Sequence, residues 1–158
     1  MTTAPIQPDG SPTGHDGGAD PEGEALVDAL AHSAFVVMGA LTRIGAEHEL
    51  SLTQLRVLGI LRDRTPRMAE LADYLGLEKS TMSGLVDRAE RRGLLERSRS
   101  LDDGRAVEVF MTAAGLELAE RVHTEVRRAL DPATGRLDAT ERQALTRLLE
   151  RMLGSAPA

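Results

Sequence analysis

Residues 78–93 constrain the fold more than any other stretch, because they read as one short helix with two very different faces. At about 100° per residue, one face is apolar and has to pack against a protein core. Its residues are Met82, Leu85, Val86 and Ala89. The other face combines small and charged residues, namely Ser80, Ser83, Gly84, Asp87 and Arg91. Small side chains allow close approach, so this helix fits either the DNA major groove or, as the alternative, an ordinary amphipathic surface role.

The ends of this helix and the segment before it are marked as well. Lys79, the only lysine in the chain, lies where the helix dipole is positive, and Gly93 is placed as a C-terminal glycine. A second short helix, residues 68–75, precedes it across Gly76. Two short helices joined by a tight glycine turn are typical of a helix-turn-helix.

One helix before this pair and two strands after it complete the pattern of a winged domain. Ser51 and Gln54 form a capping box that opens a helix ending before Pro66. Residues 94–100 and 106–111 alternate as strands around a hairpin loop with an Asp-Gly turn. Such a hairpin is a wing, and its cationic residues are Arg97, Arg99 and Arg105.

Helical periodicity also covers residues 24–50, 113 to about 129, and 138–153. We expect Asp131-Pro132 to end the second of these helices. A winged domain does not need these three helices, so their apolar faces should pack on each other and on a second copy of the chain. The stripes are Leu26, Leu30, Val37, Leu41 and Ile44, broadened by Val27, Phe35 and Met38, then Leu116, Ala119, Val122, Val126 and Leu130, and finally Leu145, Leu148, Leu149 and Met152.

The net charge of −6 argues against a nucleic-acid binder only until it is divided along the chain. Residues 1–24 hold five acidic and no basic residues, whereas residues 64–112 hold nine of each sign. The acidity therefore belongs to a tail rich in Gly and Pro, residues 1–23, which we expect to be disordered. The chain has no cysteine, no signal-peptide pattern and no uninterrupted apolar run near the ~18 residues of a membrane span, so we expect a cytoplasmic protein.

Three motifs, in this order and spacing, resemble the MarR family of transcriptional regulators. Residues 71–88, LADYLGLEKSTMSGLVDR, are similar to the family pattern LA-x-x-L-G-L-x-K-S-T-V-S-x-L-V-D-R. Residues 103–105 resemble its Asp-x-Arg wing signature, and residues 112–115 its Thr-x-x-Gly helix start. The match runs from about Leu26 to Leu153, and two positions depart from it: Glu78 replaces a capping serine and Ala89 a common leucine.

The resemblance implies a homodimer, held by the N- and C-terminal helices, that presents two winged lobes to a palindromic operator. It also implies a repressor that is released when a small, often phenolic or anionic, ligand binds between the dimer region and the DNA-binding lobe. Residues on helices that border the family's usual ligand pocket are His32, Phe35, Met38 and Leu55, although for each of them singly core or dimer packing is the favoured explanation.

The residues expected to contact DNA fall into two groups. Ser80, Ser83 and Lys79 should read bases, while Arg88 and Arg91 should position the helix on phosphates. We also expect Asp87 to pair with Arg91, and Asp103 to orient Arg105 at the tip of the wing. The full set is Lys79, Ser80, Thr81, Ser83, Gly84, Arg88, Arg91, Arg97, Arg99, Asp103 and Arg105.

The sequence thus predicts a mainly α (α+β) fold with a tail at 1–23 and a MarR-type domain at 24–158. Within that domain, residues 24–50 and 113–153 are the dimerisation helices and residues 51–112 the winged helix-turn-helix lobe. The predicted function is a ligand-responsive DNA-binding repressor, with double-stranded DNA, a second copy and a small-molecule effector as partners and no cofactor or metal. The alternative is a dimeric ligand- or protein-binding module that no longer binds DNA. An enzyme is not expected, because no phosphate loop, nucleophile elbow or metal-ligand spacing is found.

Overall fold

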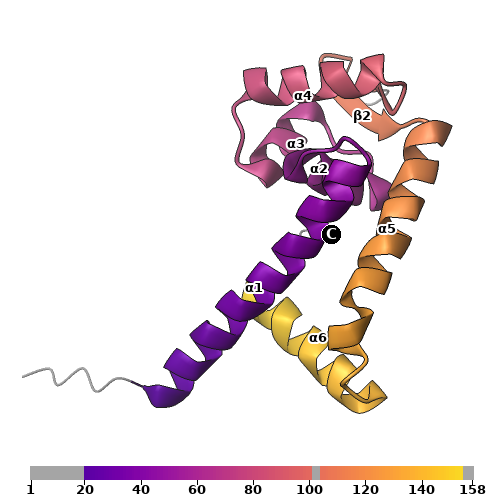
Figure 1. The fold of residues 1–158 in the computed structure, drawn as a ribbon. Coiled ribbons are helices and arrows are strands. Elements are labelled where there is room, and N and C mark those ends of the chain that lie inside the picture. Colours follow the sequence, from indigo (N-terminus) through magenta and orange to yellow (C-terminus); the bar gives the residue numbers. More distant parts are fainter. Residues whose placement is uncertain (1–19, 101–103, 155–158) are drawn as a thin grey trace, which may run out of the picture. The chain divides into compact units, whose positions relative to one another are not determined.

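The computed structural model describes residues 20–100 and 104–154, which form six helices and one two-stranded sheet (Figure 1). The fold is therefore mainly α, as the sequence predicted. The chain divides into two units, Met1–Ala34 and Phe35–Ala158, so the first helix begins in one unit and ends in the other. The elements are α1 (Pro21–Glu47), α2 (Leu52–Asp63), α3 (Met68–Leu75), α4 (Lys79–Arg91), β1 (Leu95–Arg99), β2 (Val107–Met111), α5 (Ala113–Thr134) and α6 (Ala139–Leu153).

The helix-start signals read from the sequence are confirmed by hydrogen bonds. At the start of α2, the Gln54 N–H donates to Ser51 Oγ at 3.2 Å and the Ser51 N–H donates to Gln54 Oε1 at 2.8 Å. Asp138 and Glu141 make the same reciprocal pair at the start of α6, at 2.9 and 2.8 Å. Each capping box satisfies backbone donors that a helix end otherwise leaves without a partner.

The core of the second unit is aliphatic and holds α4 by its apolar face. Met82 and Val86 of α4 have no exposed surface, and neither have Leu71 of α3 and Val109 of β2. The strands β1 and β2 pair antiparallel, with Leu95 opposite Met111. Figure 1 shows α2, α3, α4 and β2 gathered around this core, with α5 leading away from the end of β2. The core is what fixes the direction of α4.

A close approach at the start of α5 joins that helix to the end of α4. The Thr112 hydroxyl donates to the Gly93 carbonyl at 2.6 Å and accepts the Gly115 N–H at 3.0 Å. Gly115 is buried, and a Cβ added there would overlap the Leu94 carbonyl oxygen. This contact is the physical reason for a glycine three residues after the capping threonine.

Three sequence expectations about the helices are wrong. The first helix starts at Pro21, not at residue 24, because proline is pre-set for the first helical turn and Asp20 Oδ1 accepts the Glu22 N–H at 3.2 Å. The rest of the predicted tail, residues 1–19, lies outside the described residues. The helix α5 does not end at Pro132 but continues to Thr134, since a proline this close to a helix end removes only one late hydrogen bond. Leu116 is 45% exposed, and Leu118, at 6%, takes its place in the core.

Large apolar side chains remain exposed on the first and last helices. On α1, Phe35 is 77% exposed, and on α6 no residue is buried. By length and composition alone, α1 could also cross a membrane. The expectation from the sequence missed this segment because it rested on an uninterrupted apolar run. Single polar residues such as Asp28 and His32 interrupt the run in α1 but leave its average composition apolar. The exposed residues are Leu26, Val27, Phe35, Val36 and Met38 on α1, and Leu145, Leu148, Met152 and Leu153 on α6. Surface of this kind needs a cover.

Gly115→Ala tests the close approach at the start of α5. The added methyl group meets backbone, which cannot rotate away, so we expect a loss of about 1–3 kcal/mol in the free energy of unfolding. The control is Gly59→Ala, where a Cβ meets nothing within 4 Å and helix propensity favours alanine. Urea denaturation followed by circular dichroism measures both. Equal stability of the two variants would show that the contact is not needed.

Candidate nucleic-acid interface

The outward face of α4 is polar, cationic and accessible. Lys79, Ser80 and Thr81 are exposed in its first turn, and Arg88 and Arg91 are exposed further along, while Ser83 and Gly84 are half-buried. The N-cap residue Glu78 makes no side-chain hydrogen bond to the helix, so it does not occupy the backbone N–H groups of the first turn. Exposed N–H groups at a positive helix end, beside hydroxyls and a lysine, suit a phosphate or a base edge.

The turn before α4 positions this face. Gly76 adopts a left-handed conformation with φ 64°, and the Leu77 N–H donates to the Ala72 carbonyl at 2.9 Å. The predicted glycine turn is thus confirmed. With Leu71 and Met82 fully buried on either side of the turn, α3 and α4 are held as one helix-turn-helix.

Arg97 does not behave as a free cation of the wing. Its guanidinium donates to Glu90 Oε2 through Nη2 at 2.7 Å and through Nε at 3.0 Å, and it also pairs with Asp87. The predicted pairing of Asp87 with Arg91 is wrong, because the Arg91 Nε donates instead to the Asp87 backbone carbonyl at 3.3 Å. Arg97 therefore links β1 to α4. Its charge is already compensated, whereas Arg91 forms no ion pair with any described residue.

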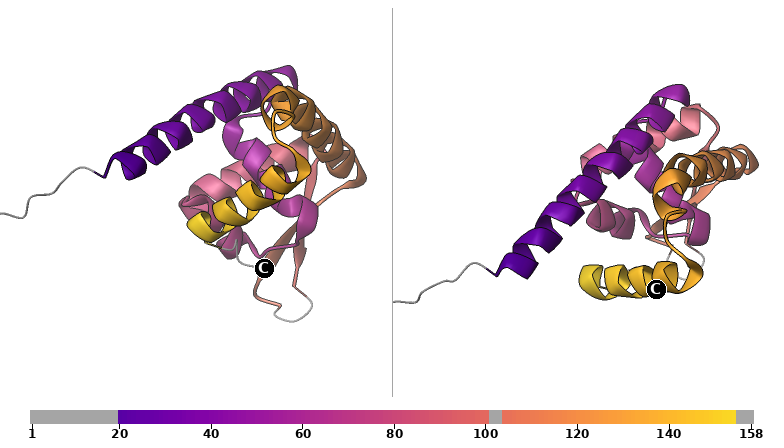
Figure 2. Two further views of the ribbon diagram at one scale, coloured as in Figure 1. Left: turned by 90° about the horizontal axis from the view of Figure 1, so that it is seen from below. Right: turned by 60° about the horizontal axis from the view of Figure 1, so that its bottom comes forward.

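The other cations around α4 are exposed to solvent. Within the part of the chain that the structure describes, neither Lys79 nor Arg88 forms an ion pair. The two strands run side by side as a hairpin, seen at the bottom of the left view in Figure 2, and Arg99 and Arg105 are exposed on it. Asp103, expected to orient Arg105, lies outside the described residues. The cationic surface consists of Lys79, Arg88, Arg91, Arg99 and Arg105.

A pocket of about 510 Å³ lies behind this surface, between the C-terminal part of α1, α2, the α3–α4 turn and α5. Of the four residues expected at a ligand site, Met38 and Leu55 line it; Phe35 does not, and His32 belongs to the other unit. Most of the lining is apolar, contributed by Met38, Leu41, Leu52, Leu55, Leu58, Leu75, Leu77, Ala119, Val122 and Val126.

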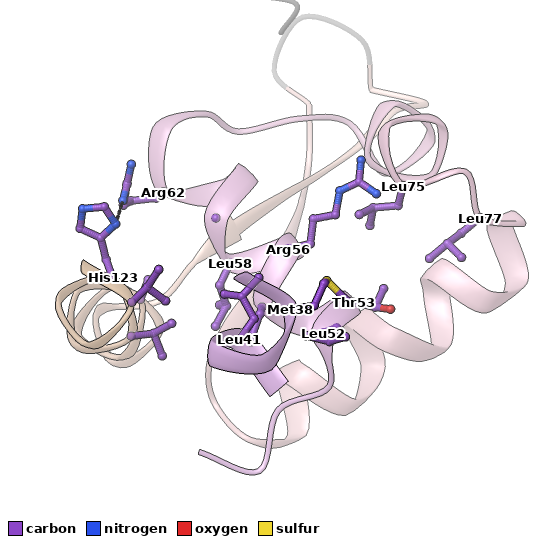
Figure 3. A pocket seen from close by; sticks show the side chains of 15 residues that line it. Met38, Leu41, Leu52, Thr53, Arg56, Leu58, Arg62, Leu75, Leu77 and His123 are labelled. Carbon is purple, nitrogen blue, oxygen red and sulfur yellow. Dashed lines mark hydrogen bonds between the residues drawn. The ribbon is translucent and has the colours of Figure 1, made fainter. Parts of the chain in front are cut away.

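The polar side chains of this pocket were not expected. Arg62 Nη1 and His123 Nδ1 lie 2.8 Å apart, linking α2 to α5, as the dashed line in Figure 3 shows. Arg56 Nη2 donates to the Tyr74 carbonyl at 3.0 Å, and no carboxylate is among the lining residues. The hydrogen bond with Asp63 raises the pKa of Arg62 and lowers that of Asp63. Arg56, Gly59 and Arg62 recur every three residues along α2, a spacing that sequence reading could have used, but His123 gives no such signal.

Comparison with known proteins shows which proteins this chain is similar to. A model of the MarR family matches residues 48–106. The HTH-type transcriptional repressor NicR of Pseudomonas putida is 32% identical over 108 residues, which cover 68% of this chain and 68% of NicR.

Two solved structures share the fold. NadR in complex with 4-hydroxyphenylacetate matches with a TM-score of 0.71 and 21% identity, over 96% of this chain and 99% of the NadR chain. A mutant of MarR from Escherichia coli complexed with operator DNA matches with a TM-score of 0.64 and 24% identity, over 84% of this chain and 96% of that chain.

Arg97→Ala tests whether Arg97 is a structural link between β1 and α4. Because its partners Asp87 and Glu90 are only partly buried, we expect the free energy of unfolding to fall by about 1 kcal/mol, and by less at high salt. Arg99→Ala on the same strand, where no ion pair forms among the described residues, should leave stability unchanged. Urea denaturation at low and high salt compares them. If Arg97→Ala were as stable as the wild type at low salt, the link would not hold the wing.

Proposed function

The chain belongs to the MarR family of transcriptional regulators, and we propose that it is a repressor that binds an inverted-repeat operator as a homodimer and releases it on binding a small anionic molecule. The observation that carries this proposal is α4. Its apolar face is buried, and its outward face carries hydroxyls at the N-terminal end and, further along, exposed arginines that form no ion pair with the described residues. Such a helix matches the width of the DNA major groove.

Different residues of α4 are proposed to read the bases and to position the helix on the DNA backbone. Ser80, Thr81 and Ser83 lie near the end that enters the groove first, where Gly84 allows close approach, so the serine hydroxyls reach base edges. Lys79 can donate to a guanine from the same end. Arg88 and Arg91, with Arg99 and Arg105 on the wing, neutralise phosphates and supply affinity that does not depend on sequence.

Homodimerisation is proposed from the exposed apolar side chains of α1 and α6. Covering a large aliphatic or aromatic side chain stabilises an interface by about 1.5–3 kcal/mol, and a second copy supplies matching surface. Two lobes related by a dyad then present two copies of α4 to half-sites whose centres lie roughly 10 bp apart. If α1 crossed a membrane instead of packing on a second copy, the winged lobe would have no second lobe beside it on the DNA.

The effector is proposed to occupy the pocket between α2 and α5. Its apolar walls suit a ring or short chain, and Arg56, Arg62 and His123 suit a carboxylate or phenolate. The fold relative NadR was solved with 4-hydroxyphenylacetate, a ligand of this chemistry. Binding there would replace the Arg62–His123 contact and so change how α2 sits against α5.

Ser83→Ala and Arg91→Ala separate reading from positioning. We expect Ser83→Ala to change preference among single-base variants of a half-site by ~1 kcal/mol or more, because a base contact is lost. Arg91→Ala should weaken all sequences alike and reduce the salt slope of binding by about one phosphate. Competition binding at two salt concentrations measures both. The reverse outcome would contradict the assignment, and an absence of any retarded genomic fragment would favour a module that no longer binds DNA.

Arg62→Gln tests the pocket with 4-hydroxyphenylacetate as the probe. Loss of a charge-assisted hydrogen bond to the carboxylate should weaken binding roughly 10-fold or more. The control is Arg121→Gln, which changes an exposed arginine of α5 that lies outside the pocket and 3.9 Å from Glu117. Isothermal titration calorimetry compares the three proteins. If Arg62→Gln bound 4-hydroxyphenylacetate with the affinity of the wild type, the carboxylate would have to bind elsewhere.

A further inference from the structure

Arg92, which caps the C-terminal end of α4, reaches across to the turn between α1 and α2. Its Nη1 donates to the Glu49 carbonyl at 2.9 Å and its Nη2 donates to the His48 carbonyl at 3.1 Å. One planar guanidinium thus bridges two consecutive carbonyls more than forty positions earlier in the chain. These carbonyls lie at the negative end of the α1 dipole, where a cation is stabilised.

The turn that Arg92 holds is tightly built. Glu49 has φ 54°, the one positive φ among the described non-glycine residues, and the Leu50 N–H donates to the Gly45 carbonyl at 2.7 Å. A Cβ on Gly45 would come within 2.6 Å of the Leu50 carbonyl oxygen, so only glycine permits the approach. A backbone confined in this way gives Arg92 a fixed point of attachment.

The same turn is attached to α5. His48 Nε2 lies 2.8 Å from Glu125 Oε2, and both side chains are partly buried. Glu125 directly precedes Val126, which lines the pocket. The turn therefore connects the C-terminal end of α1 and the middle of α5 to the end of the recognition helix.

We propose that Arg92 is a positioning residue for operator recognition: it fixes the angle of α4 relative to α5 and to the part of α1 from Phe35 to Glu47, and thereby the half-site spacing that the dimer accepts. This role rests on the proposed function. Each Nη of Arg92 already donates to the protein, which holds the guanidinium in place. A phosphate contact through its remaining N–H groups is the alternative, and it would appear in the salt slope of binding. Neighbouring Arg91 differs, since in the described chain only its Nε donates, to the Asp87 carbonyl.

The test uses Arg92→Gln, with Arg92→Lys as a milder variant that keeps the charge and one donor. Affinities are measured for inverted repeats whose half-sites are at the preferred spacing or moved apart or together by one base pair. The wild type should bind the repeat at the preferred spacing much more tightly than the repeats at the other two spacings. Losing a bidentate charged contact should reduce that discrimination roughly 5- to 10-fold in Arg92→Gln, and less in Arg92→Lys, with an unchanged salt slope.

Arg91→Gln is the matched control, because it should lower affinity and salt slope but keep the spacing preference. If Arg92→Gln keeps the wild-type discrimination, or loses about one phosphate unit of salt slope, the positioning role is overturned while the proposed function stands. If the wild type itself binds no inverted repeat, the proposed function fails and the role of Arg92 with it. Thermal unfolding of each variant establishes that the binding measurements report folded protein.

Discussion

The burial of one face of α4 is the constraint on which the rest of the structure depends. Met82 and Val86 are fully buried in a core that α4 shares with α2, α3, β1 and β2, so the opposite face of the helix has to point outward. A two-stranded sheet and three short helices are too small to enclose more than this one stripe. Links at the edges add precision: Arg97 ties α4 to the wing, and Arg92 ties it to the end of α1.

The terminal helices show what a single chain leaves incomplete. The end of α1 is packed into the core through Ile44, whereas Phe35 and most apolar side chains of α6 are left exposed by the described part of the chain. The chain has only two phenylalanines and no tryptophan, so it contains few large apolar side chains. Those exposed on α1 and α6 are therefore proposed to pack between two copies of the chain. In that arrangement, the pocket behind α2 lies where a ligand can affect both the dimer helices and the DNA-binding lobe.

Local signals in the sequence were sufficient for the winged lobe and insufficient for its polar contacts. Periodicity located Met82 and Val86, and the capping residues Ser51 and Asp138 located two helix starts, because these features act within one helix. The pairing of Asp87 with Arg97 rather than Arg91 depends on the strand that folds back along α4, which spacing within a helix cannot reveal. For the same reason Arg62 and His123, 61 positions apart, were not expected to meet. The prediction that α5 ends at Pro132 was wrong because the free-energy cost of a proline in a helix depends on how near the helix end it lies.

The central claim is that two copies of this chain act together on one inverted repeat. The most direct measurement is the molar mass, by size-exclusion chromatography with light scattering, of the protein alone and bound to its operator duplex. We predict twice the 17.0 kDa of one chain in solution, and the same two chains on each duplex. A monomer of 17.0 kDa that binds the duplex as a single copy, or that sediments with lipid vesicles through α1, would contradict the account.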